Sequence, residues 1–85
     1  MNYAIEIKPA AMKALAGLPR ADQQRIRGKI EALANNPRPV GVVKLSGPEN
    51  LYRVRSGDYR VVYQICDRIL VVVIIRIGHR REVYR

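Results

Sequence analysis

The chain contains neither tryptophan nor phenylalanine, and it has one cysteine and one histidine among its 85 residues. A single cysteine, Cys66, cannot form an internal disulfide, which is typical of proteins from a reducing compartment. One histidine, one cysteine and scattered acidic residues give no ligand set at metal-binding spacing, so we expect no metal and no other cofactor. The core has to be built from Ile, Leu, Val, Ala and the five tyrosines.

Long apolar segments are missing as well. The longest apolar run, Ile69 to Ile75, has seven residues, whereas a helix needs roughly 20 to cross a bilayer. The first residues, Met1 to Glu6, show no basic segment followed by an apolar one, so no secretion signal is expected. These absences favour a cytoplasmic protein without membrane contact. The length predicts a single domain over residues 1–85.

Acidic residues are few, because seven Asp and Glu stand against sixteen Lys and Arg and the formal net charge is +9. A charge of this size attracts polyanions in a salt-dependent way. Twelve of the sixteen basic residues are arginines, and a planar guanidinium matches phosphate better than an ammonium does. The first candidate for the polyanion is RNA.

The first half of the chain reads as a strand followed by two helices. Residues 3–7 alternate between apolar and polar, which predicts a strand. Pro9 suits the first turn of a short helix that ends near Gly17, with Met12 and Leu15 as its apolar stripe. A longer helix is expected over residues 20–34, before the stop signal at residues 35–37. Its apolar face consists of Ile26, Ile30 and Leu33.

The second half reads as three strands with short turns between them. They are predicted at Leu51–Arg55, Tyr59–Ile65 and Ile69–Ile77, and residues 42–45 either extend or precede the first of them. Short connections make neighbouring strands antiparallel. The predicted fold is therefore α+β: an N-terminal strand, a two-helix hairpin and an antiparallel three-stranded meander, in one sheet with the helices on one face.

Arginines follow the alternation of the first two of these strands. If Gly57-Asp58 is the two-residue loop of a type II′ turn, Arg55 lies directly opposite Arg60, and Arg53 lies opposite Val62. The three arginines then share one face, and the core side consists of Tyr52, Val54, Val61, Tyr63 and Ile65. Directly opposed like charges are destabilising. An anion site on this face is one interpretation, and solvated arginines on an open sheet are the other.

The segment Gly57–Tyr63, the apolar strand after it and the closing segment Gly78–Arg85 resemble the RelE branch of the RelE/ParE toxin superfamily. The resemblance covers nearly the whole chain. It implies a toxin of a type II toxin–antitoxin pair with a compact, RelE-like microbial ribonuclease fold. It also implies metal-independent cleavage of messenger RNA in the ribosomal A site, in which the ribose 2′-OH attacks the adjacent phosphate and the 5′-oxygen leaves.

The resemblance matches the basic strand residues of the family to Arg53, Arg55 and Arg60. Well-known members carry lysines where this chain has Arg53 and Arg55. Lysine can lose its proton when its pKa is depressed, whereas arginine effectively cannot. The resemblance therefore implies that these three arginines grip and neutralise phosphates and that the general base is another residue.

The remaining site residues come from the closing segment. The resemblance implies that Arg80 stabilises charge or assists the leaving group, and that the base is Tyr84 or His79. Both have a structural alternative, since Tyr84 could anchor the end of the chain and His79 could stack on a base or pack at a strand end. Further contacts with RNA are expected from Arg81, Arg85 and Lys44.

The implied partners are the ribosome with its messenger RNA and a RelB-like antitoxin, through which the toxin–antitoxin complex could bind DNA. Two other functions stay open. A ParE-like relative would poison DNA gyrase without catalysis, and a third possibility is a catalytically weak module that binds RNA or ribosomes. Members of the ParE branch usually lack the converging arginines and the final tyrosine segment, which favours the ribonuclease.

Overall fold

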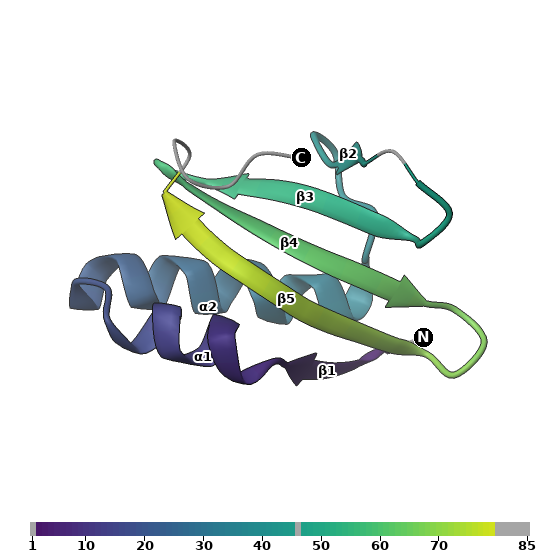
Figure 1. Cartoon of the computed structure of the whole chain (residues 1–85), viewed down its shortest axis with the longest axis horizontal. Helices are drawn as coiled ribbons and strands as arrows, with labels where there is room; N and C mark the ends of the chain where they lie inside the picture. Colours follow the sequence, from purple (N-terminus) through teal and green to yellow (C-terminus); the bar gives the residue numbers. More distant parts are fainter. Residues whose placement is uncertain (1, 46, 80–85) are drawn as a thin grey trace.

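The computed structural model of the chain describes residues 2–45 and 47–79. In chain order the elements are β1 (Ala4–Ile7), α1 (Pro9–Ala16), α2 (Arg20–Asn35), β2 (Val43–Lys44), β3 (Leu51–Ser56), β4 (Tyr59–Cys66) and β5 (Val71–His79). Within these residues the strands form one five-stranded sheet in the order β1-β5-β4-β3-β2. Both helices lie on one face of it (Figure 1). The predicted α+β fold is confirmed.

The sheet is mixed. Strands β3, β4 and β5 pair antiparallel, as the short turns between them predicted. Strand β1 instead pairs parallel with β5, and its register places Ala4 opposite Val71. A parallel neighbour needs a long crossover connection, and here both helices lie between β1 and the rest of the sheet along the chain. The sequence had not specified which strand would accept β1.

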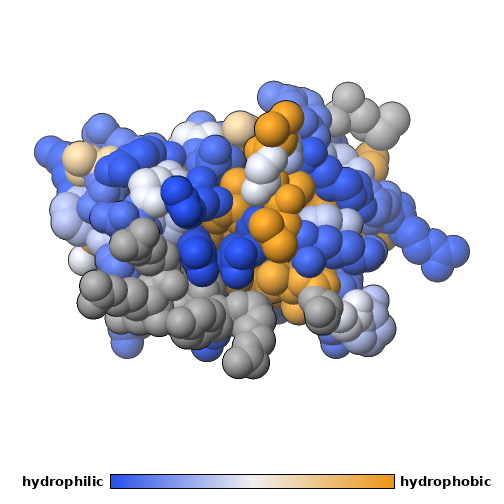
Figure 2. All heavy atoms as spheres, turned by 90° about the horizontal axis from the view of Figure 1, so that it is seen from above, coloured by the Kyte–Doolittle hydropathy of each residue, from blue (hydrophilic) through white to orange (hydrophobic). Residues whose placement is uncertain are grey.

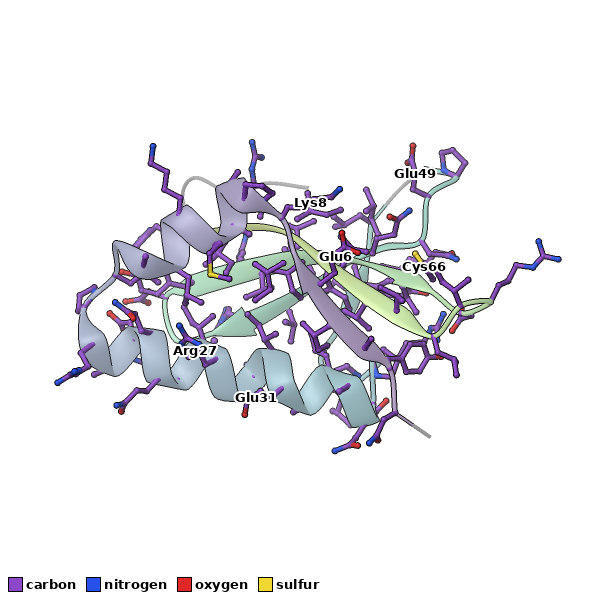
Figure 3. All side chains as sticks on the ribbon, turned by 90° about the horizontal axis from the view of Figure 1, so that it is seen from below. Glu6, Lys8, Arg27, Glu31, Glu49 and Cys66 are labelled. Atoms are coloured by element: carbon purple, nitrogen blue, oxygen red, sulfur yellow. The ribbon has the colours of Figure 1, made fainter. Side chains whose placement is uncertain are left out.

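The two helices lie across the lower face of the sheet (Figure 3). Helix α2 buries Ile26, Ile30 and Leu33, which confirms the apolar face predicted for it. No helix within the described ranges is long and apolar enough to cross a membrane.

Helix α1 differs from the prediction in its buried face. Leu15 is buried as expected, but Met12 is 45% exposed, and Ala11 is fully buried in its place. Ala11 and Leu15 are four residues apart and so lie on the same side of the helix. Since α1 packs directly on β5, a small alanine at the contact allows the helix to approach the sheet closely.

The ends of the elements differ slightly from the predicted ones. Helix α2 continues through Asn35, one residue beyond the predicted end. Strand β5 begins at Val71 rather than at Ile69 and continues to His79. Residues 67–70 form the turn before it, where Ile69 is 69% exposed and Leu70 has a φ of 55°. The apolar run therefore begins in a turn.

A β-bulge interrupts the pairing of β4 with β5. Val62 lies opposite Arg76, whereas the next residue of β4, Tyr63, lies opposite Ile74. Strand β5 therefore contains one extra residue at this point. Strict alternation would put Ile74 and Ile77 on different faces, because they are three residues apart. The bulge allows both to be buried in the core.

Candidate functional site

The β3–β4 hairpin carries the predicted arginines in the predicted register. Arg55 lies opposite Arg60, and Arg53 lies opposite Val62. Gly57 has a φ of 61° and Asp58 does not have a positive φ, as a type II′ turn requires. The short loop fixes the register of the whole hairpin because each strand continues directly from it.

Alternation then separates the two faces of the hairpin. The five residues predicted for the core side are all buried in the hydrophobic core: Tyr52, Val54, Val61, Tyr63 and Ile65. The arginines occupy the intervening positions and so point to the face away from the helices. Figure 2 shows this face, where hydrophilic side chains gather beside a strip of hydrophobic ones.

The three arginines meet in one concavity. A hollow of about 200 Å³ is lined by Gly41, Val43, Arg53, Arg55 and Arg60, and we call it the arginine hollow. Val43 of the edge strand β2 lies directly opposite Arg53 and so forms its outer wall. Gly41, with a φ of 89°, contributes no side chain, and an added Cβ there would meet nothing within 4 Å. The hollow is therefore open on the side of β2.

No residue that the structure describes neutralises the guanidiniums of the arginine hollow. Arg53, Arg55 and Arg60 form no hydrogen bond and no ion pair with any residue of the ranges 2–45 and 47–79. Arg55 and Arg60 are also directly opposed, and this arrangement of like charges is unfavourable in the free protein. A bound anion would remove the repulsion. The hollow therefore has the charge, the shape and the hydrogen-bond donors to hold a phosphate group.

Among the described residues, none that lines the arginine hollow could accept a proton. Its lining contains no Asp, Glu, His, Lys or Tyr, and arginine is protonated at any working pH. In the described part of the chain, no group of three or more His, Cys, Asp or Glu residues could hold a metal ion. The described lining has the chemistry to hold an anion, and it contains no side chain suited to abstract a proton.

His79 lies in a different place. It pairs with Tyr59 across the sheet, and the two rings meet edge to face with centroids 5.8 Å apart. Tyr59 packs against the core, so this pair is on the helix side of the hairpin. A second hollow, of about 280 Å³, is lined there by Asp22, Arg25, Gly57, Asp58, Tyr59 and His79. The structure does not bring His79 together with the three arginines.

Lys44, the remaining predicted site residue that the structure describes, does not line the arginine hollow. Lys44 is exposed and lies opposite Tyr52, a core residue, so it is on the other face of β2 from Val43. The catalytic candidates Arg80 and Tyr84 and the RNA contacts Arg81 and Arg85 lie outside the described residues. Their roles stay predictions.

One arginine on the open face was not singled out from the sequence. Arg76 lies opposite Val62 and is exposed. Strict alternation from the buried Val72 and Ile74 would have put residue 76 on the core side. The bulge shifts Arg76 to the same face as the arginine hollow. The signal in the sequence is a single charge within an otherwise apolar strand, immediately before Ile77.

A second arginine environment is visible only in the structure. We call it the Arg38 cluster, and it comprises Tyr3, Arg38, Tyr52 and Asp67. Arg38 Nη2 donates to Asp67 Oδ2 at 2.8 Å, and Arg38 Nε donates to the Tyr52 hydroxyl at 3.2 Å. The Tyr3 hydroxyl donates to Asp67 Oδ1 at 2.7 Å. Hydrogen bonds from Arg38 and then from Tyr3 lower the pKa of Asp67. The cluster ties the N-terminus, the α2–β2 loop and the β4–β5 turn together.

Comparisons with known proteins agree on one family. The family described as ParE toxin of the type II toxin–antitoxin system, parDE, matches residues 5–84. The mRNA interferase toxin RelE of Escherichia coli K12 is 32% identical over 99% of this chain and 92% of that protein. The toxin RelE of Mycobacterium tuberculosis H37Rv is 41% identical over 75% of each chain.

Solved structures show the same fold. The archaeal RelE–RelB complex from Pyrococcus horikoshii contains a chain that superposes with a TM-score of 0.86 and 34% identity, covering 98% of this chain and all of that one. The isolated RelE toxin of Escherichia coli superposes with a TM-score of 0.80 and 26% identity, covering 91% of this chain and 83% of that one.

Proposed function

Because the chain belongs to the RelE/ParE superfamily and is a toxin of a type II toxin–antitoxin system, we propose that it is a ribosome-dependent endoribonuclease that cuts messenger RNA in the A site. The main support is the arginine hollow, which is lined by three arginines that have no partner among the described residues. The name mRNA interferase of the 32% identical Escherichia coli relative supports the same activity.

The proposed reaction is an intramolecular transesterification. The 2′-oxygen forms a bond to phosphorus while the bond from phosphorus to the 5′-oxygen breaks. The products are a 2′,3′-cyclic phosphate and a 5′-hydroxyl end, and the proton lost by the 2′-OH is balanced by the proton gained by the leaving oxygen. Negative charge builds up on the non-bridging oxygens in the transition state. We assign the stabilisation of that charge to Arg53, Arg55 and Arg60.

The proton transfers need residues other than these three arginines, because a guanidinium cannot accept a proton. We assign the role of base to Tyr84 and the stabilisation of the leaving group to Arg80. His79 is the weaker candidate, since it lines the hollow on the helix side of the hairpin. Arg81, Arg85 and Lys44 are assigned to contacts with RNA away from the scissile bond.

The proposed partners follow from the family. A relative has been crystallised with RelB, and we expect this toxin to bind an acidic, RelB-like antitoxin. Such a segment would reduce the strong positive charge of the toxin. The toxin–antitoxin complex is expected to bind DNA through the antitoxin, while the free toxin binds the ribosome.

The test is cleavage of a defined messenger RNA on purified ribosomes, with the new ends mapped by primer extension and their 5′-hydroxyl confirmed by kinase labelling. The double variant Tyr84→Phe/Arg80→Ala is expected to lose cleavage, while Arg68→Gln, an exposed arginine of the β4–β5 turn, keeps it. Unchanged cleavage by the double variant would remove the proposed site.

A second function is favoured by one observation, which is that the matching family is described by the ParE name. A gyrase poison would produce DNA breaks in arrested cells and leave messenger RNA intact. A module that only binds RNA would associate with ribosomes without new RNA ends. Either result would replace the endoribonuclease.

A further inference from the structure

Arg76 extends the cationic surface beyond the arginine hollow. A single cross-strand row runs over the open face of the sheet through Val43, Arg53, Val62 and Arg76. Neighbouring strands are about 4.8 Å apart, so the backbones at Arg53 and Arg76 are separated by about 10 Å. Arg76 therefore stands on the side of the row opposite the edge strand β2, with Val62 between it and Arg53.

No contact among residues 2–45 and 47–79 accounts for a charge at position 76. Arg76 is exposed, and it forms no hydrogen bond and no ion pair with any residue in the part of the chain that the structure describes. Its neighbour across the strand pair is Val62, which is 6% exposed and offers no carboxylate. The β-bulge that points Arg76 to this face also keeps Ile77 in the core. The bulge thus adds a fourth guanidinium without a described partner to the face that carries the arginine hollow.

We propose that Arg76 binds a backbone phosphate of single-stranded RNA next to the phosphate held in the arginine hollow. The proposal rests on the proposed function in taking the polyanion to be RNA. Arg53, Arg55 and Arg60 act on the reacting phosphate, whereas Arg76 is a positioning residue that fixes the direction in which the strand crosses the sheet. Its contact is the same before and in the transition state, so it contributes to binding and not to the chemical step.

The first test measures binding without cleavage, by fluorescence anisotropy of a 2′-O-methyl RNA strand over a range of salt concentrations. Each phosphate contact on a single strand contributes about 0.7 to the slope of log K against log salt. Arg76→Gln is expected to reduce the slope by about 0.7 and to weaken binding by about threefold to tenfold at low salt. Arg76→Lys, which keeps the charge, is expected to retain the slope.

The matched control is Arg27→Gln, which removes the same charge from an exposed position of α2 on the helix side of the molecule (Figure 3). The slope of log K against log salt for Arg27→Gln is expected to equal that of the wild-type protein. An Arg76→Gln slope equal to that of the wild-type protein or of Arg27→Gln would overturn the proposal, as would a wild-type protein that does not bind the strand. Thermal melting of each variant verifies that the fold is retained.

The second test uses cleavage on ribosomes and separates this inference from the proposed function. Arg76→Gln is expected to raise KM and to leave kcat within about twofold of the wild-type value. The reason is that it removes a contact that is equally strong in the bound substrate and in the transition state. Arg60→Gln is expected to lower kcat. A fall of kcat alone in Arg76→Gln would overturn the positioning role. The wild-type protein could fail to cleave RNA while Arg76→Gln still reduces the slope of log K against log salt. That result would refute the endoribonuclease and retain the phosphate contact of Arg76.

Discussion

The arginine hollow and the Arg38 cluster lie on the same small sheet, and their guanidiniums have opposite surroundings. Arg38 donates to Asp67 and to the Tyr52 hydroxyl, so its charge is neutralised and its donors are used within the protein. Arg55 and Arg60 face each other and have no acidic partner in the described part of the chain. In the described part of the chain, pairing with Asp67 and Tyr52 separates the structural guanidinium of Arg38 from those of the arginine hollow, for which we propose a bound phosphate.

The largest expected effect comes from removing two positive charges from the arginine hollow. The double variant Arg55→Gln/Arg60→Gln should reduce kcat for cleavage on ribosomes by at least about 10²-fold, the usual scale for one lost transition-state donor. Its Tm should stay the same or rise slightly, because a directly opposed pair of like charges is removed. The measurements are cleavage kinetics and a thermal melt. A large fall in Tm with cleavage retained would show that Arg55 and Arg60 stabilise the fold and do not act in cleavage.

Next comes the buried tyrosine beside the Arg38 cluster. The Tyr63 hydroxyl donates to the Pro37 carbonyl at 2.7 Å, and its ring stacks on that of Tyr52. Tyr63→Phe should lower the free energy of unfolding by about 1 kcal/mol, because a buried carbonyl loses its donor, with kcat unchanged. Urea denaturation checks the first expectation and cleavage kinetics the second. Equal stability would show that water replaces the hydroxyl.

The same residue predicts a loss of stability in alkali. Burial is the main cause that raises the pKa of Tyr63 to about 12, whereas the unfolded chain titrates near 10. Between about pH 10 and pH 12 the unfolded state therefore binds fewer protons, and this residue's contribution falls by about 1.4 kcal/mol per pH unit. Urea denaturation of wild type and Tyr63→Phe across this window should show the difference, since phenylalanine does not titrate. Parallel curves for the two proteins would contradict it.

A smaller effect is expected from the Arg38 cluster itself. Arg38→Gln should lower Tm by about 4 °C or less, because its ion pair with Asp67 is largely exposed, and cleavage should be unaffected. Asp67 has a lowered pKa, so the stability that it contributes is present at neutral pH and is lost as the pH falls through and below its ordinary range. Asp67→Asn should flatten the acid limb of a Tm-against-pH curve. A loss of cleavage in Arg38→Gln would show that this arginine acts on the RNA as well as stabilising the fold.

The smallest expected effect is that of His79→Gln. A general base contributes about 10²- to 10⁴-fold, but His79 lines the hollow on the helix side, so kcat should change by less than about threefold. The measurement is a pH–rate profile of wild type and variant on ribosomes. A fall of about 10²-fold in kcat would return His79 to the reaction.

The hairpin and its arginines could be predicted because their causes are local. The Gly57-Asp58 loop fixes the register, and alternation then assigns Arg53, Arg55 and Arg60 to one face. The apolar face of α2 follows in the same way from helical spacing. The face of Arg76 and the position of His79 relative to the arginines could not be predicted. Both depend on β5, whose alternation is broken by the bulge.

The sequence by itself determined the order of the elements, the register of the β3–β4 hairpin and the excess of arginine, since each of these depends on neighbouring residues or on composition alone. Only the tertiary structure decided that β1 joins β5, that a bulge brings Arg76 to the open face and that Asp67 neutralises Arg38. The physical reason is that these features join residues far apart in the chain, as in the pairing of Ala4 with Val71. Such contacts are selected by how the whole core packs, and no local pattern contains them.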